Sequence, residues 1–98
     1  MSLEVRSAKL LDLVDSGAQV EQIGTGCVFT EGPIWDAEGG FLLFSDIPAN
    51  QMKKWTPDSG ITTFRQPSGK SNGLTYDKQK RLIACEHANR RVSRTELD

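Results

Sequence analysis

The sequence predicts an all-β fold, and more specifically a β-propeller built from repeats of four short strands. Three observations lead to this prediction. Turns rich in glycine, proline and aspartate divide the chain after residue 30 into short apolar segments. The pattern of these segments restarts at Asn72, 41 residues after Glu31. A unit of about 40 residues with four strands is typical of a propeller blade.

The first unit, residues 31–66, is predicted to form one complete blade. Turns with the composition Asp-Ala-Glu-Gly-Gly and Pro-Asp-Ser-Gly separate its apolar segments. The second segment is apolar almost throughout, so we expect it to be buried on both faces. The four predicted strands cover residues 34–35, 41–45, 51–55 and 61–64.

The second unit, residues 72–98, repeats this order but ends before a fourth strand. Each unit begins with a polar residue and a glycine, followed by a short apolar segment, an aromatic residue and an aspartate. The chain thus supplies about one and a half blades. Since blades bury their faces against neighbours, about three or more are needed for a stable array. We expect the remainder of a propeller, or self-association, to complete the fold. The alternative is a small sandwich or barrel with accidental similarity between the units.

Residues 1–19 are predicted to form an N-terminal arm that precedes the propeller part, residues 20–98. Residues 4–16 carry a weak helical stripe of leucine and valine, which predicts a short helix or an irregular segment. Residues 20–23 alternate between apolar and polar side chains, which predicts an edge strand.

The composition argues against several classes of function. Twelve Lys and Arg residues against 13 Asp and Glu give a net charge of −1, without the basic surface of a nucleic-acid-binding protein. The longest apolar run is too short to span a membrane, and the N-terminus lacks a signal-peptide pattern. We expect a cytoplasmic protein. Cys27 and Cys85 are predicted to be free, buried thiols, and a single histidine provides no zinc-binding set.

Antiparallel topology predicts where a site would lie. The start of the innermost strand and the end of the second strand share one face of the propeller. Glu31 and Asn72 should therefore face the central channel from adjacent blades. Asp46, Glu86 and His87 should lie on the same face, further out. Oxygen ligands around a channel mouth suit a hard cation such as calcium or magnesium.

Each of these residues also has a structural interpretation. Glu31 could be a solvated loop acid, and Asn72 could serve its Asn-Gly turn. His87 could act in base catalysis or substrate contact, or be a surface residue. Asp46 and Glu86 are interpreted first as rim charges or turn caps.

Two further groups of residues are interpreted as structural. The arginine-rich segment 90–94 is expected to be a solvated strand face, with phosphate or substrate binding as the alternative. Trp35 and Tyr76 recur at one position of the repeat, which predicts that both lie in the core between blades. Trp55 is predicted to pack in the core or at an edge.

Four segments together resemble the senescence marker protein-30/gluconolactonase/luciferin-regenerating-enzyme-like family, and its bacterial gluconolactonase-like members in particular. The likeness extends over about residues 18–96. The segments, in chain order, are Thr-Glu-Gly-Pro-Ile-Trp at 30–35, Leu-Phe-Ser-Asp-Ile-Pro at 43–48, Ser-Asn-Gly-Leu-Thr at 71–75 and Ala-Cys-Glu-His at 84–87.

The resemblance implies a six-bladed propeller and hydrolysis of a sugar lactone with a divalent metal in the channel. Glu31 would be a metal ligand, with calcium as the first expectation and zinc or magnesium as alternatives. Asn72 would contact substrate or water, and His87 is a weaker candidate for substrate binding. The other ligands and the catalytic acid/base are expected beyond residue 98, so the 98-residue chain alone is expected to be inactive.

Two other functions remain open at this point. One is a related propeller esterase or phosphotriesterase, and the other is a propeller that serves as a non-catalytic binding module. A chain truncated or designed for its own sake, assembling through its open strand edges, is a third possibility.

Overall fold

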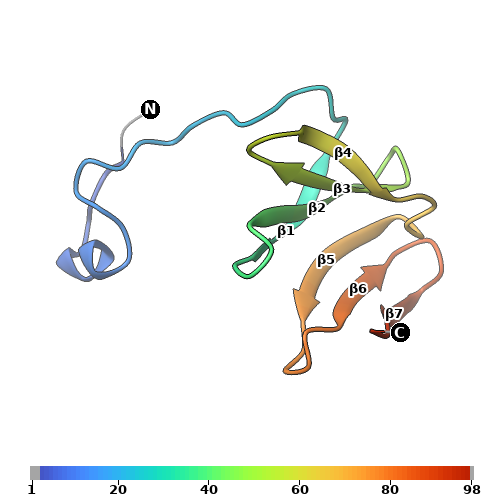
Figure 1. The fold of residues 1–98 in the computed structure, drawn as a ribbon. Helices are drawn as coiled ribbons and strands as arrows, with labels where there is room; N and C mark the ends of the chain where they lie inside the picture. Colours follow the sequence, from blue (N-terminus) through green and yellow to red (C-terminus); the bar gives the residue numbers. More distant parts are fainter. Residues whose placement is uncertain (1–2, 98) are drawn as a thin grey trace.

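The computed structural model describes residues 3–97 and confirms the all-β fold. The strands form two antiparallel sheets in the orders β1-β2-β3-β4 and β5-β6-β7 (Figure 1). The number of blades in a complete ring stays a prediction. The elements are a 3-10 helix η1 (Ala8–Asp12) and the strands β1 (Thr30–Asp36), β2 (Phe41–Asp46), β3 (Gln51–Thr56), β4 (Gly60–Arg65), β5 (Ser71–Tyr76), β6 (Leu82–Glu86) and β7 (Arg91–Arg94).

Strand β1 begins earlier than the predicted strand at residues 34–35 and includes Gly32 and Pro33. The pairing of β1 with β2 shifts register between Glu31 and Ile34. Gly32 has a φ of 64°, and Pro33 has no N–H to donate. Both residues are therefore accommodated in an irregularity of the strand, as glycine and proline usually are within sheets. The acid at position 31 lies within the strand, next to this irregularity.

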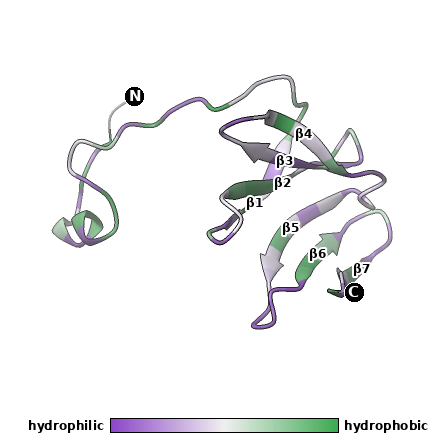
Figure 2. Ribbon diagram, in the orientation of Figure 1, coloured by the Kyte–Doolittle hydropathy of each residue, from purple (hydrophilic) through white to green (hydrophobic). Residues whose placement is uncertain are grey.

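The two sheets enclose one apolar core, because β5 packs against β1 and β2. The hydropathy colouring shows apolar stretches on strands of both sheets (Figure 2). Leu43 is 1% exposed and Met52 is fully buried. The expected burial of residues 41–45 is confirmed toward the C-terminal end of β2 and is only partial at its first two residues. The buried cluster consists of Leu43, Met52, Leu74, Leu82 and Ala84.

The aromatic pair expected between blades is divided by the structure. Tyr76 is half-buried and packs against the core, in line with the prediction. Trp35 is 51% exposed, so its predicted core position is wrong for the described chain. It lies on the first strand of the first sheet, and within residues 3–97 no other sheet precedes this one to cover it. Trp55 is half-buried, and its indole Nε1 donates to the Ile23 carbonyl over 3.1 Å.

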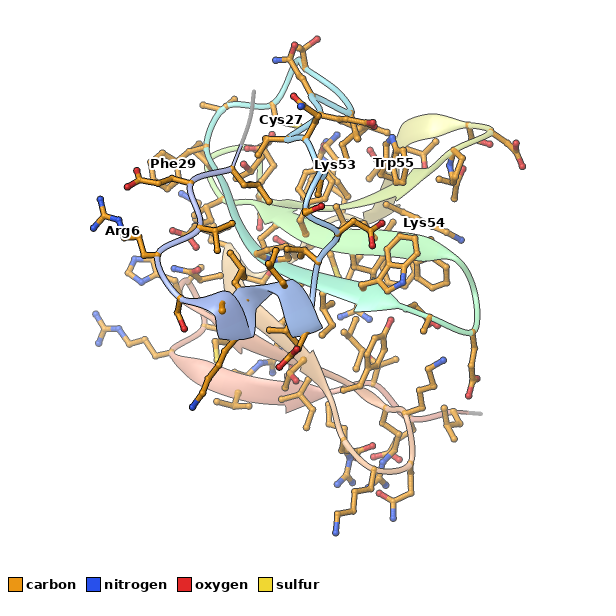
Figure 3. The ribbon with its side chains drawn as sticks, turned by 90° about the vertical axis from the view of Figure 1, so that its left-hand side faces the viewer. Arg6, Cys27, Phe29, Lys53, Lys54 and Trp55 are labelled. Carbon is orange, nitrogen blue, oxygen red and sulfur yellow. The ribbon has the colours of Figure 1, made fainter. Side chains whose placement is uncertain are left out.

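The N-terminal arm forms η1 and then an extended segment that leads over to β1 (Figure 1). The edge strand predicted at residues 20–23 is wrong, because this segment carries no strand. Side-chain contacts, such as the bond from Trp55, hold it near the first sheet in place of a backbone ladder. Figure 3 shows the first sheet from the side of the arm, with Trp55, Lys54 and Cys27 labelled. No helix in residues 3–97 is long and apolar enough to cross a membrane.

The cysteines differ from expectation in their exposure. Cys27 is half-buried and Cys85 is exposed, and both are free thiols. The prediction of buried thiols is therefore wrong for Cys85. It lies on β6, which pairs with β5 and β7 and has one face open to solvent at this position.

Candidate functional site

Glu31 and Asn72 lie on the adjacent strands β1 and β5, near the same end of the two sheets. Both residues are exposed. Gly32, which follows Glu31, lies so close to the Asn72 carbonyl that a Cβ at position 32 would overlap it. The backbones of the two strands thus touch beside the candidate residues. Within residues 3–97 the side chains of Glu31 and Asn72 form no hydrogen bond with each other.

A hydroxyl pair holds the same end of the interface together. The Ser45 and Ser71 hydroxyls lie 2.9 Å apart, and both residues are fully buried. Ser45 Oγ also lies 2.9 Å from the Asn72 carbonyl, to which it can donate. Since buried polar groups are costly without partners, these bonds fix the relative position of β2 and β5. They therefore hold Asn72 against β2, the strand that pairs with β1 and so lies next to Glu31.

Asp46, interpreted from the sequence as a rim charge or a turn cap, is buried. It is 2% exposed, and its carboxylate accepts hydrogen bonds from the backbone amides of Val28 and Phe29. The distances are 3.2 Å and 3.0 Å. Of the two structural interpretations, the cap of backbone groups is the one that fits. Asp46 anchors the chain immediately before β1, and so it fixes the point at which Glu31 enters the sheet.

Glu86 is also buried, at 7% exposure, which corrects its interpretation as a solvated rim charge. Its Oε1 accepts from Asn89 Nδ2 at 2.6 Å and from Arg91 Nε at 3.1 Å. A hydrogen bond from Ser93, followed by those from Asn89 and Arg91, lowers the pKa of the Glu86 carboxyl, while burial opposes this. The group is thus held as a carboxylate.

His87 does not join Glu31 and Asn72 in a side-chain cluster. It is exposed, and its backbone N–H donates to the Lys70 carbonyl over 3.3 Å. The imidazole forms no hydrogen bond within residues 3–97, which agrees with the interpretation of His87 as a surface residue.

The part of the chain that the structure describes does not by itself form a metal site. No three His, Cys, Asp or Glu side chains in residues 3–97 are placed to share an ion. Calcium takes about 6–8 oxygen ligands, and Glu31 with Asn72 could supply only a few of them. These residues alone do not fit a resident metal, so no reaction step through a metal is derived for this chain.

A hollow beside Glu31 was not predicted from the sequence. Its volume is about 610 Å³, and it lies between residues 22–28, which lead up to β1, and the face of the first sheet. Leu42, Phe44 and Ile61 form its apolar lining, and Glu31 borders it. Residues 22–28 carry no sequence motif that indicates this contact, because they meet the sheet as an irregular segment.

A second polar connection between the sheets lies at the Asp36 end of β1. Asp36 is 8% exposed and accepts from Lys80 Nζ at 2.7 Å and from the Tyr76 hydroxyl at 3.3 Å. The bond from Lys80, followed by that from the Gly39 amide, lowers the pKa of Asp36. Lys80 also pairs with Glu38 at 2.9 Å. This connection is ionic, whereas the one beside Asn72 is neutral.

Comparison with known proteins adds the identity of the family. Residues 29–97 match the model of the SMP-30/gluconolactonase/LRE-like region. A gluconolactonase from Zymomonas mobilis is 48% identical over 63 residues, which are 64% of this chain and 18% of that protein.

Two solved structures are also similar. One, assigned to the gluconolactonases by a structural genomics consortium, is 33% identical, with a TM-score of 0.79 over 92% of this chain and 31% of its own. The gluconolactonase of Xanthomonas campestris is 30% identical, with a TM-score of 0.65 over 74% of this chain and 24% of its own. This chain therefore spans less than a third of the length of each relative. The match over residues 29–97, which carry both sheets and both candidate residues, places this chain in the SMP-30/gluconolactonase/LRE-like family.

Proposed function

We propose that the complete protein hydrolyses a sugar lactone at a site to which Glu31 and Asn72 contribute. The observation that carries the proposal is their placement in a gluconolactonase-family chain. The two residues lie on touching strands, Gly32 against the Asn72 carbonyl, and both remain exposed. Exposed polar residues at such a tightly fixed junction are available for a ligand.

The finer parts of the proposal concern the fold and the metal. The two sheets would be the first blades of a six-bladed propeller, and its remaining residues would complete the site. Glu31 would be one ligand of a divalent cation, calcium before zinc or magnesium. Such an ion polarises a carbonyl and lowers the pKa of a bound water. The role of Asn72 would be to orient the lactone carbonyl or a sugar hydroxyl through its amide.

The chain's own residues explain why the junction can hold these groups in place. Asp46 fixes the backbone before β1, and the Ser45 hydroxyl fixes the carbonyl of Asn72. Rigid support of this kind is what a binding site needs, because a side chain misplaced by about 1 Å loses much of its effect.

The direct test is δ-gluconolactone hydrolysis by the complete protein and its Glu31→Gln variant. We expect kcat/KM to fall about 100-fold or more, because loss of even an indirect metal contact costs about 10–100-fold. Acid release should be followed against the spontaneous hydrolysis of the lactone, and bound metal should be quantified in parallel. Glu21→Gln is the matched control, since Glu21 is exposed and lies outside the hollow. Unchanged turnover and metal content in Glu31→Gln would refute the assignment.

Metal removal provides an independent test. Treatment with a chelator should abolish turnover above background, and calcium should restore it. Full activity after complete metal removal would contradict the metal-dependent part of the proposal. It would leave a metal-independent esterase as the better explanation. Binding of a lactone without hydrolysis would favour the non-catalytic alternative.

A further inference from the structure

A second recess lies between the two sheets, and the catalytic proposal does not use it. Its volume is about 310 Å³. Three connections border it: the β2–β3 turn with Asn50, the link from β4 to β5 with Ser68, and the β6–β7 turn with Asn89. Glu86, in its wall, pairs through the β-ladder with Ser71, the neighbour of Asn72. The recess therefore opens at the same end of the sheets as the candidate site.

The walls of the recess are held by hydrogen bonds from the link between the sheets. The Ser68 amide donates to the Asn50 carbonyl at 3.1 Å, and the Lys70 amide donates to Asn50 Oδ1 at 2.9 Å. On the other side, the Ala88 amide donates to the Gly69 carbonyl at 2.9 Å. Ser68 itself is 4% exposed. One short link thus binds both hairpin turns, so the recess is formed before any ligand arrives.

The charges of the recess come from two arginines on different sheets. Arg65 ends β4 and Arg91 begins β7. The only acid among the lining residues is Glu86, which is already bound to Asn89 and Arg91. Two guanidiniums against one carboxylate leave an excess of positive charge. The acid therefore serves to hold Arg91 in place and does not cancel Arg65.

Both guanidiniums retain donors for a ligand. Arg65 donates from Nη2 to the Thr95 hydroxyl over 2.7 Å, and Arg91 donates from Nε to Glu86. Within residues 3–97 their other N–H groups have no protein acceptor. A guanidinium is a planar fork that matches the oxygens of a carboxylate or phosphate, and its charge is permanent. Two such groups, each held by one bond, are suited to a small oxyanion.

We propose that this recess binds a small oxyanion, the carboxylate or phosphate group of a small molecule, through Arg65 and Arg91. Arg65 would provide the unneutralised charge and Arg91 the second set of donors. The volume of the recess, about 310 Å³, is large enough for a compact anion. This proposal does not depend on the lactonase proposal. Only one detail does: if the natural ligand is the carboxylate that lactone hydrolysis produces, that identification rests on the proposed function.

The test uses the complete protein and titration calorimetry at constant ionic strength, with inorganic phosphate, gluconate and uncharged sorbitol as probes. Constant ionic strength is needed because salt screens exposed charges. We expect phosphate or gluconate to bind and sorbitol not to bind. Preference between the two anions distinguishes a phosphate source from a carboxylate source.

Variants assign the binding to the recess. Arg65→Gln and Arg91→Gln should each weaken anion binding about tenfold or more, since each removes a charged hydrogen-bond donor group from the recess. Arg94→Gln is the matched control, because Arg94 lies on the same strand as Arg91, pairs with Glu96 and does not line the recess. Arg65→Lys keeps the charge and covers the case in which Arg65→Gln does not fold. It should bind more weakly than the wild type and more tightly than Arg65→Gln where that variant folds.

Two results would overturn the proposal. One is the absence of anion binding by the wild-type protein. The other is equal weakening by Arg94→Gln and the recess variants, which would show a diffuse charge effect. The Glu31→Gln variant separates the two proposals: it should lose hydrolysis while it keeps anion binding. Intact hydrolysis without anion binding would refute only the proposal that the recess binds an oxyanion.

Discussion

The two sheets carry the same sequence pattern but use equivalent positions differently. Gly32 on β1 lies against the Asn72 carbonyl, while Gly73, its counterpart on β5, would place a Cβ at an ordinary 3.9 Å from Cys85 Sγ. Asp36 binds Lys80 of the other sheet, while its counterpart Asp77 binds only its own turn. In the described chain, the first sheet is followed by the second sheet, which packs against it, whereas no further sheet follows the second. The repeated sequence pattern thus determines where the strands form, and the presence or absence of an adjacent sheet determines which contacts each equivalent residue makes.

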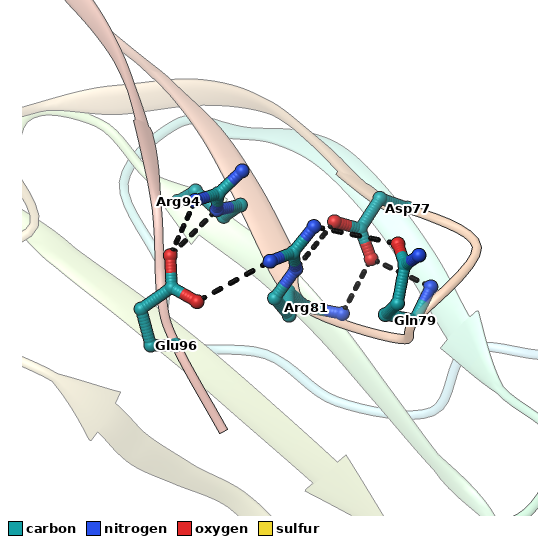
Figure 4. A network of polar contacts seen from close by, with 5 residues as sticks. All are labelled: Asp77, Gln79, Arg81, Arg94 and Glu96. Carbon is teal, nitrogen blue, oxygen red and sulfur yellow. Dashed lines mark hydrogen bonds and ion pairs between the residues drawn. The ribbon is translucent and has the colours of Figure 1, made fainter. Parts of the chain in front are cut away.

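Figure 4 shows the local network that Asp77 forms in the second sheet. Its carboxylate accepts from Arg81 Nε at 2.7 Å and from the Arg81 amide at 2.9 Å. Arg81 continues to Glu96 at 3.4 Å, and Glu96 pairs with Arg94. The network therefore joins the β5–β6 turn to the chain after β7, and it does not reach the first sheet.

The largest expected effect comes from Gly32→Ala. The new Cβ would overlap the Asn72 carbonyl, and position 32 has a positive φ that side chains rarely adopt. Strain and overpacking together should lower the free energy of unfolding by about 3 kcal/mol or more. Gly73→Ala is the matched control and should have a much smaller effect. Denaturant unfolding of the complete protein measures both, and equal losses would show that the asymmetry between the sheets is not real.

Asp46→Ala should have the next largest effect. Its removal takes the charged acceptor from the part-buried hydrogen bonds of the Val28 and Phe29 amides, which should cost about 2 kcal/mol, because a hydrogen bond to a charged group contributes about 1.5–3 kcal/mol. Glu86→Ala should cost less, because Asn89 and Arg91 are side chains that can turn toward water. The same unfolding experiment compares the two acids. A larger loss for Glu86→Ala would contradict the anchoring role of Asp46.

Ser45→Ala should cost about 1 kcal/mol, since it removes one buried hydroxyl from a pair. Ser71→Ala should have a similar effect, and the double variant should cost less than the sum of the two. This cycle measures the coupling across the sheets directly. Strict additivity would mean that the two hydroxyls do not depend on each other.

The smallest effect at neutral pH, and a distinctive one in acid, is expected for Asp36→Asn. The pKa of Asp36 is lowered in the folded state, so its stabilising contribution is complete above about pH 4 and is lost as the pH falls through the folded pKa. The difference in stability between wild type and Asp36→Asn should therefore shrink below about pH 4. Asp77→Asn should show the same sign, because the pKa of Asp77 is also lowered, but without a change in contacts between the sheets. Thermal unfolding from pH 3 to 7 measures both, and a difference that grows in acid would have the wrong sign.

Much of the fold could be predicted from the sequence because turn chemistry and apolar periodicity act locally. The strands of the first unit and the restart at Asn72 followed from such signals. The exposure of Trp35 could not be predicted, since it depends on which sheets surround it. The strand predicted at residues 20–23 failed for a related reason: alternation creates a strand only where a partner strand is available.

The candidate site was predictable in part. That Glu31 and Asn72 lie near the same end of the two sheets followed from antiparallel topology, and the roles proposed for them came from the family resemblance. The burial of Asp46 and Glu86 was missed, because a single acid after a strand does not reveal its partners. The recess between Arg65 and Arg91 was missed as well, since it forms from segments far apart in the chain. The metal, the blade number and the cytoplasmic location stay predictions.

The bond between Asp46 and the amides of Val28 and Phe29 has a mechanical consequence. A pull on the N-terminal arm would reach β2 through this carboxylate before it could peel β1 from its partner. Strand β2 is hydrogen-bonded on both sides, so it resists displacement better than a strand at the border of a sheet. Movement of the preceding segment would therefore be resisted at Phe29, one residue before β1 begins. Glu31 can thus keep its position if residues 3–22, which precede the contact of Ile23 with Trp55, move.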